Sequence, residues 1–153
     1  MNCPHLKFHR LTAQITTSPK LAGLLAELDM STGNPYSNKE AWVAAVSKIF
    51  NGPESEMEDN IHALYAADVT VTANGSSMKM TELIAYIKNI RNMAPTVEIT
   101  SHCFLRDGNF FADKHTVVGI GHDGSKTQVE NLVVGELNEE GKCFWIEEQS
   151  RFV

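Results

Sequence analysis

The sequence lacks any apolar run long enough to cross a membrane and any cluster of basic residues. A membrane-spanning helix needs about 20 apolar residues, and nucleic acids and anionic membranes are bound mainly through Lys and Arg. The chain has 13 Lys and Arg against 19 Asp and Glu, a net charge of −6. Its N-terminal stretch also lacks the apolar centre of a signal peptide. We therefore expect a cytoplasmic protein that binds neither nucleic acid nor membrane.

The chain is also poor in the residue patterns that build disulfides, metal centres and phosphate loops. Its three cysteines, Cys3, Cys103 and Cys143, are too scattered for a disulfide framework or a Cys-x-x-Cys site. The histidines show no zinc-ligand spacing. Neither a glycine-rich phosphate loop nor the motif of a nucleophilic serine is present. The sequence therefore predicts no metal and no cofactor.

The sequence does have a clear change of hydrophobic period near residue 68. Before it, apolar residues recur at helical spacing, which predicts three helices. One begins at Ser18-Pro19, the second begins at the capping box SNKE (37–40) with Ser37 as the cap, and the third ends at about Ala67. After it, alternation predicts a strand at 69–73, closed by a turn at Asn74-Gly75. A helix capped by Thr81 follows, and then long strands at about 97–106, 109–120, 127–137 and 142–153.

Helices followed by a meander of antiparallel strands predict fold class α+β, a cone-shaped barrel with helices packed on a strongly curved antiparallel sheet. The 153 residues are enough for one hydrophobic core. We expect an N-terminal arm with one short helix, residues 1–36, and a single domain, residues 37–153.

Alternation along a strand predicts which side chains face the helices. In 142–153 the more apolar set contains Phe144, Ile146, Glu148, Ser150 and Phe152, so the adjacent carboxylate of Glu147 should face away. In 127–137 the inward set is expected to be Val129, Asn131, Val133, Gly135 and Leu137.

The other two long strands are harder to orient. In 109–120 we expect the inward set to be Phe110, Ala112, Lys114, Thr116, Val118 and Ile120, which leaves Asp113 and His115 facing out. Asp113, His115 and Glu130 become pocket residues only if this orientation is off by one residue. In 97–106 alternation makes Val97, Ile99, Cys103 and Leu105 the apolar face and turns His102 outward; a bulge would reverse the pattern beyond it.

These faces bring four polar side chains into an apolar concavity, namely Lys114, Thr116, Asn131 and Glu148. A few convergent polar groups in an apolar hollow are typical of a small-molecule site. A carboxylate held there has its ionised form desolvated, which favours proton transfer near neutral pH. Trp42 and Tyr65 are expected in the core or the pocket wall.

Two stretches resemble the nuclear-transport-factor-2-like (NTF2-like) superfamily. LYAADVTVTANG (64–75) is similar to the segment that joins the third helix of that fold to its first strand, and GKCFWIEEQSRF (141–152) is similar to its last strand. The resemblance covers about residues 38–153. It implies long curved strands around a cone-shaped pocket, as in SnoaL-like polyketide cyclases, scytalone-dehydratase-like enzymes and limonene-epoxide-hydrolase-like enzymes.

The resemblance also implies candidate residues. The last-strand acid of the cyclases and epoxide hydrolases falls on Glu148. The epoxide hydrolases' arginine falls on Lys114 and their asparagine on Asn74, but their second acid falls on Thr116 and their tyrosine on Thr72. The dehydratases' histidine corresponds to His102 in TSHCF (100–104), and their second histidine to Ile120. The three positions used by steroid isomerases are apolar here, which argues against that activity: Val46, Ala73 and Val133.

We predict a cofactor-independent isomerase, cyclase or dehydratase that acts by acid–base proton transfer on a mostly apolar polyketide- or terpenoid-like molecule, in secondary-metabolite biosynthesis. Glu148 would move the proton, with His102 or Lys114 as the complementary donor. The predicted substrate-binding residues are Trp42, Tyr65, Asn74, Thr116, Ile120, Asn131 and Ile146.

Two alternative functions remain open, and the expected partner is a second copy of the chain. The chain could be a non-catalytic ligand-binding or dimerisation module, or a hydrolase whose water is held by Glu148 and Asn74. By resemblance we also expect a homodimer, because the outer sheet face would otherwise expose much apolar area. The residues assigned to that face are Phe111, Val117, Leu132, Val134 and Trp145.

Overall fold

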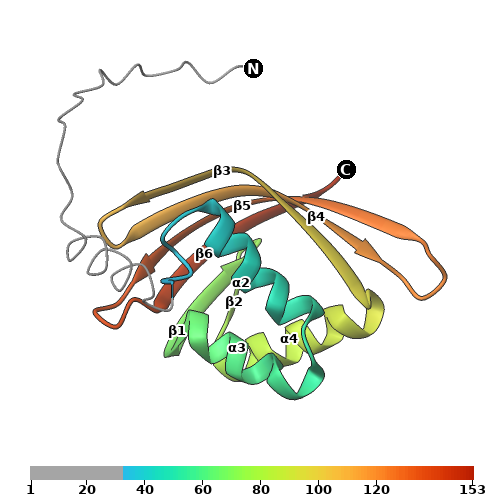
Figure 1. The fold of residues 1–153 in the computed structure, drawn as a ribbon, viewed down its shortest axis with the longest axis horizontal. Helices are drawn as coiled ribbons and strands as arrows, with labels where there is room; N and C mark the ends of the chain where they lie inside the picture. Colours follow the sequence, from blue (N-terminus) through green and yellow to red (C-terminus); the bar gives the residue numbers. More distant parts are fainter. Residues whose placement is uncertain (1–32) are drawn as a thin grey trace, which may run out of the picture. The chain divides into compact units, whose positions relative to one another are not determined.

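The computed structural model describes residues 33–153 (Figure 1). The helix predicted from Ser18-Pro19, and most of the predicted arm, residues 1–36, lie outside the described residues. The described part contains helices α2, α3 and α4, a short 3-10 helix η1, and strands β1 to β6. Within this part no helix is long and apolar enough to cross a membrane.

Helix α2 (Lys39–Asn51) begins at the predicted capping motif, but with a different capping residue. The N-cap is Asn38, whose side-chain oxygen accepts a hydrogen bond from the N–H of Ala41 at 2.9 Å, where we expected Ser37. One face of the helix buries Trp42 and Ile49. The cap therefore fixes the start of the helix that delivers Trp42 to the core.

The other helices differ slightly from prediction at their ends. After η1 (Glu54–Glu56), α3 (Met57–Leu64) ends where β1 begins, so Tyr65 is the first residue of a strand. Helix α4 (Met80–Met93) starts after Lys79, where we expected a cap at Thr81. A carboxylate oxygen of Glu82 accepts the N–H of Lys79 at 2.8 Å and satisfies a group at this helix end.

The strands form one six-stranded sheet in the order β2-β1-β6-β5-β4-β3. Their bounds are β1 (Tyr65–Ala73), β2 (Ser76–Met78), β3 (Thr96–Asp107), β4 (Phe110–Ile120), β5 (Lys126–Leu137) and β6 (Cys143–Phe152). All neighbours are antiparallel except β1 and β6. Between β1 and β2, Asn74 (φ 49) and Gly75 (φ 83) make the predicted hairpin turn, which needs positive φ at both positions.

Helices α2, α3 and α4 lie on one side of this curved sheet (Figure 1). The core fills the space between them and the sheet, with contributions from every layer; its most buried side chains are Tyr36, Ile49, Met57, Ile61, Leu64, Val69, Leu137 and Cys143. The predicted α+β class, with helices covering a curved sheet that is largely antiparallel, is confirmed.

The predicted orientation of β4 is wrong by one residue. Phe111, Asp113 and His115 face the helices and are 2%, 0% and 7% exposed, whereas Lys114 is exposed on the other side. Asp113 is the Cα partner of the buried Val133 on the neighbouring strand β5, which places both side chains on the inner face. A one-residue slip moves every side chain to the opposite face, so Lys114, Thr116 and Ile120 lie on the outer face.

Strand β3 contains the bulge that alternation alone could not place. Ser101 pairs with His115 and Cys103 with Lys114, so His102 is the extra residue. Beyond the bulge the pattern reverses: Phe104 packs against the core and Leu105 is 64% exposed. The expectation that Cys103 and Leu105 face inward is wrong, and His102 is exposed.

In β5 and β6 the predicted orientation holds over most of the strand length. Val133, Gly135, Leu137 and Ile146 are buried. A register shift at the start of β6 leaves Phe144 unpaired and turns Cys143 into the core, where it is fully buried. At the other end Phe152 pairs with Val129 and so lies on the predicted face, but it is 80% exposed there.

Candidate functional site

A row of polar side chains crosses the inner face of the sheet. Ser101, His115, Asn131 and Ser150 are successive Cα partners across β3, β4, β5 and β6. In the neighbouring row Asp113 and Glu148 flank Val133. The rows on either side are apolar, with Val117 and Val129 on one side and Phe111 and Ile146 on the other. The inner face therefore carries a polar band between two apolar bands.

Asp113 is the most deeply buried member of this band. Its Oδ2 accepts the indole N–H of Trp42 at 2.8 Å, and its Oδ1 accepts the Ser101 hydroxyl at 2.5 Å. Nδ1 of His115 lies 2.7 Å from Oδ2. Burial raises the pKa of Asp113, but the interactions with His115, Ser101 and Trp42 outweigh it and hold the pKa below its usual range. Asp113 is therefore a buried carboxylate in its ionised form.

His115 joins Asp113 to Asn131. Its Nδ1 approaches Asp113 out of line for a good hydrogen bond, and its Nε2 lies 3.1 Å from Nδ2 of Asn131. An anion next to Nδ1 favours a proton on that nitrogen, which leaves the Nε2 lone pair to accept from the Asn131 amide. Oδ1 of Asn131 is buried without a partner within residues 33–153.

Glu148 occupies the β6 end of the band. The Ser150 hydroxyl donates to Oε1 of Glu148 at 2.8 Å, and the Ser150 N–H donates to Oδ1 of Asn74 at 2.8 Å. Burial, and then the negative charge of Glu148, raise the pKa of Tyr86 on α4. Glu148 is half-buried and faces the helices, as the sequence predicted.

Aromatic rings enclose the Asp113 end of the band. Trp42 lies 5.3 Å from Tyr36, 5.4 Å from Phe111 and 6.3 Å from Phe104, measured between ring centroids. Tyr36 is itself anchored, because its hydroxyl donates to the carbonyl of Leu64 at 2.9 Å. These contacts exclude water from Asp113 and strengthen the hydrogen bonds made to it.

An apolar groove lies next to this site, between α2 and β3. It has a volume of about 400 Å³ and is lined by Lys39, Glu40, Val43, Ala44, Ile99, Thr100 and Ser101. Ser101 is shared between the groove and the hydrogen-bond network of Asp113. The groove therefore offers apolar surface close to the polar band.

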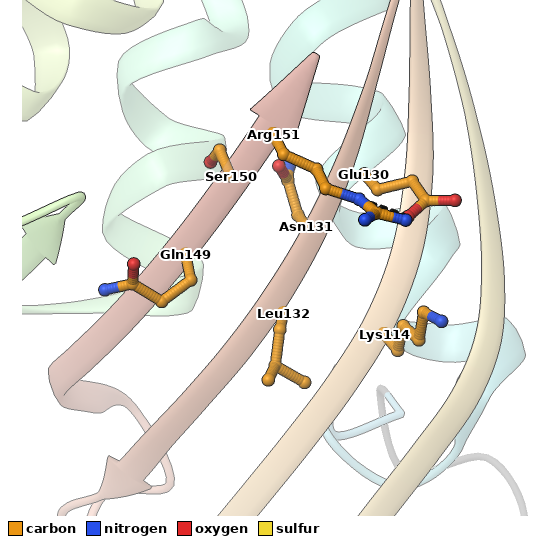
Figure 2. A pocket seen from close by; sticks show the side chains of 7 residues that line it. All are labelled: Lys114, Glu130, Asn131, Leu132, Gln149, Ser150 and Arg151. Atoms are coloured by element: carbon orange, nitrogen blue, oxygen red, sulfur yellow. Dashed lines mark hydrogen bonds and ion pairs between the residues drawn. The ribbon is translucent and has the colours of Figure 1, made fainter. Parts of the chain in front are cut away.

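A second hollow, of about 500 Å³, contains the predicted Lys114 and opens toward the exposed side chains of the outer sheet face (Figure 2). Arg151 donates two hydrogen bonds to Oε2 of Glu130, at 2.9 and 2.6 Å. His102 lies nearby on the same face, with Nε2 2.7 Å from the Thr116 hydroxyl. The hollow is lined by Lys114, Glu130, Asn131, Leu132, Gln149, Ser150 and Arg151.

The structure therefore divides the predicted site residues between two faces. Trp42, Asn131, Ile146 and Glu148 lie on the inner side, Tyr65 packs against the core, and Asn74 stands in the β1–β2 turn beside Ser150. Lys114, Thr116 and Ile120 lie on the outer face, with His102. The predicted convergence of Glu148 with His102 and Lys114 does not occur.

From the sequence we expected Asp113 and His115 in the site only if the orientation of 109–120 were off by one residue, and it is. The signal that could have found them is their spacing: residues i and i+2 of a strand share a face, so an Asp-x-His sequence places an acid beside an imidazole. Among residues 33–153 no group of three or more His, Cys, Asp or Glu side chains is arranged to hold a metal ion.

Comparison with known proteins gives similarity in structure only. No protein-family model matches the sequence, and no curated protein matches it. An NTF2-like protein of unknown function from Exiguobacterium sp. 255-15 is 16% identical, with a TM-score of 0.59, over 71% of this chain and 96% of that one.

Two further solved structures have stated activities. IdmH, a proposed polyketide cyclase from Streptomyces antibioticus, is 13% identical with a TM-score of 0.58, over 71% of this chain and 88% of that one. An LEH-like epoxide hydrolase of M. tuberculosis is 17% identical with a TM-score of 0.55, over 71% and 81%. The chain has the NTF2-like fold, as its sequence resemblance implied.

Proposed function

We propose that this chain is a cofactor-independent enzyme that transfers a proton within a mostly apolar small molecule, as an isomerase, cyclase or dehydratase. The observation that carries the proposal is the buried Asp113 carboxylate, 2.7 Å from Nδ1 of His115. An acid held beside an imidazole orients it and stabilises the imidazolium that forms when Nε2 takes up a proton. Nε2 of His115 is thus the proposed base.

Glu148 is the proposed complementary proton donor or acceptor. It shares a row with Asp113 but stands two strands away, about 10 Å at the usual strand spacing. The reacting molecule would lie between the two groups, where the proton taken at one carbon can be replaced at another position. The Asn131 amide is hydrogen-bonded to Nε2 of His115, so the substrate must displace that amide to reach the base.

The apolar rows favour a polyketide- or terpenoid-like substrate. Val117, Val129 and Ile146 flank the polar band, and the groove beside Ser101 adds Val43 and Ile99. Apolar walls with few polar groups suit a hydrocarbon skeleton with one or two oxygens. Structural neighbours include a proposed polyketide cyclase, which is compatible with this substrate class.

The test is proton exchange at carbon. A panel of apolar cyclic ketones and β-hydroxy ketones is incubated with the protein in D₂O, and deuterium uptake and water loss are followed by mass spectrometry. His115→Gln should abolish exchange above the buffer rate, and His102→Gln, on the outer face, should retain it. Exchange at the wild-type rate in His115→Gln would show that the base is assigned wrongly.

A non-catalytic binding module is the second candidate, favoured by the aromatic packing around Asp113. Tyr36, Trp42 and Phe111 are each at most 3% exposed and fill the space above that carboxylate. Ligand-observed NMR on the same panel separates the two functions. Compounds that bind but show no exchange and no water loss with the wild-type protein would favour the binding module.

We also propose a homodimer through the outer sheet face, with a corrected set of residues. Phe111 and Val117 belong to the inner set of β4, so they cannot contribute. The exposed apolar residues of the outer face are Leu105, Phe110, Leu132 and Val134. Their neighbouring positions make one apolar area, which is typical of an association surface.

A further inference from the structure

Asp113 receives two donors that do not come from His115. Trp42 donates to Oδ2, the oxygen that faces Nδ1 of His115, and Ser101 donates to Oδ1. Trp42 comes from α2 and Ser101 from β3. With one donor on each oxygen, the carboxylate is held against rotation about its terminal bond.

The proton on His115 follows from this arrangement. A neutral imidazole carries one N–H, either at Nδ1 or at Nε2. At 2.7 Å from a carboxylate oxygen, a lone pair on Nδ1 would be repelled, whereas an N–H is attracted. The Asn131 amide nitrogen, 3.1 Å from Nε2, fits the same arrangement, with Nε2 as acceptor. The ionised, fixed Asp113 therefore selects the Nδ1–H form.

We propose that Trp42 and Ser101 are positioning residues, which hold the Asp113 carboxylate ionised and close to Nδ1 so that His115 presents the Nε2 lone pair to the active-site side. Neither residue touches the reacting atoms. The link to catalysis rests on the proposed function, but the effect on the proton of His115 does not. This positioning role differs from packing, because it depends only on the hydrogen bonds donated by the N–H of Trp42 and the hydroxyl of Ser101.

Loss of either donor has a defined consequence. Burial opposes a negative charge at Asp113, so a carboxyl group with fewer donors is more readily protonated. It also becomes free to turn. A protonated carboxyl can donate to Nδ1, which moves the imidazole proton to Nε2 and removes the lone pair from that nitrogen. Other charges do not fix the ring, since Glu148 stands two strands away.

The experiment is nitrogen-15 NMR of the His115 side chain in the full-length protein at neutral pH. The ring nitrogens resonate far apart when one form dominates and move toward each other when two forms exchange. The wild-type protein should show Nδ1 as the protonated nitrogen and Nε2 as the unprotonated one. In Trp42→Phe and in Ser101→Ala the two resonances should converge, and Ser101→Thr should restore the wild-type positions.

The control is Trp145→Phe, which removes an indole from the outer side of β6 and should leave both resonances in place. Thermal melts establish that each variant is folded, and Ser101→Ala keeps the test valid if Trp42→Phe does not fold. Unchanged resonances in folded Ser101→Ala would overturn the proposal. If the resonances converge in the variants but the wild-type protein exchanges no substrate protons in D₂O, the positioning role of Trp42 and Ser101 is upheld and the proposed function is wrong.

Discussion

Asp113 and His115 stand two residues apart on β4, share the inner face of the sheet, and bring Oδ2 and Nδ1 to within 2.7 Å of each other. A charged aspartate with no exposed surface is stable only if donors surround it. Here hydrogen-bond donors come from α2 and β3, and the imidazole of His115 on β4 itself adds a close polar contact. The carboxylate therefore ties one helix and two strands together at the proposed active site.

Asp113→Asn should lower stability although it conserves shape. The amide places N–H₂ against at least one of the donors that now point at the carboxylate, so a buried donor loses its acceptor. The expected loss in the free energy of unfolding is about 1–3 kcal/mol. Urea denaturation measures it. Asp68→Asn, at an exposed position of β1, should change stability by less than about 0.5 kcal/mol. Equal losses in both variants would contradict the role given to the network.

The same carboxylate should contribute to acid sensitivity. Its pKa in the folded protein is lowered, so it stabilises the fold at pH values above its unfolded pKa of about 3.9 and this contribution is lost as the pH falls through the folded value. Stability curves of wild type and Asp113→Asn should run parallel above about pH 5 and converge below pH 4. A gap that stays constant down to pH 2 would show that the charge is not what Asp113 contributes.

Most of the architecture followed from sequence periodicity, but the orientation of β4 did not. Both faces of that strand contain apolar residues, such as Phe110 on one and Phe111 on the other, so alternation allowed either choice. We expected Lys114 to face in and Asp113 to face out, and the structure has the reverse. The donor that makes burial possible, Trp42, stands 71 residues away in the chain. No local pattern reports such a long-range partner.

The bulge at His102 had no sequence signal either, because no glycine or proline marks it. The bulge reverses which residues of β3 face inward. Ser101, before the bulge, donates to Asp113, and Phe104, after it, packs against the core. Glu148, in contrast, was placed correctly, because the last strand has one clearly more apolar face around it. The orientation of a strand could be predicted where one of its faces was clearly more apolar than the other.

Gly135→Ala should disturb the aromatic wall of the site. A Cβ at this position would lie 2.5 Å from Cε1 of Phe111 and 3.0 Å from the carbonyl oxygen of Trp145. Phe111 must then shift against Tyr36 and Trp42, at a cost of about 1–3 kcal/mol. Gly33→Ala is the control, since nothing lies within 4 Å of its added Cβ. Equal melting temperatures for both variants would show that Phe111 moves freely.

Val134→Lys should weaken the proposed homodimer. Val134 is 39% exposed on β5, in the apolar area of the outer face, and a lysine there would bury two charges at a symmetric contact. Light scattering after size-exclusion chromatography should show a dimer for the wild-type protein and a monomer for the variant. Met93→Lys is the matched control, because Met93 is exposed on α4, away from the sheet face. A monomeric wild-type protein would contradict the proposed interface.

The Glu147–Glu148 pair offers the sharpest comparison for the second proton-transfer group. Glu148 faces the helices and holds the Ser150 hydroxyl, whereas Glu147 is exposed on the opposite side of the strand. Glutamine keeps the shape and the bond to Ser150 but cannot exchange a proton, so Glu148→Gln should slow turnover in the D₂O assay by roughly 10²–10⁴-fold. Glu147→Gln changes the same charge one residue away and should leave turnover within about twofold of wild type. If both variants kept wild-type rates, the complementary group would have to be sought outside β6; if both lost activity equally, the loss would reflect net charge near the site and not proton transfer by Glu148.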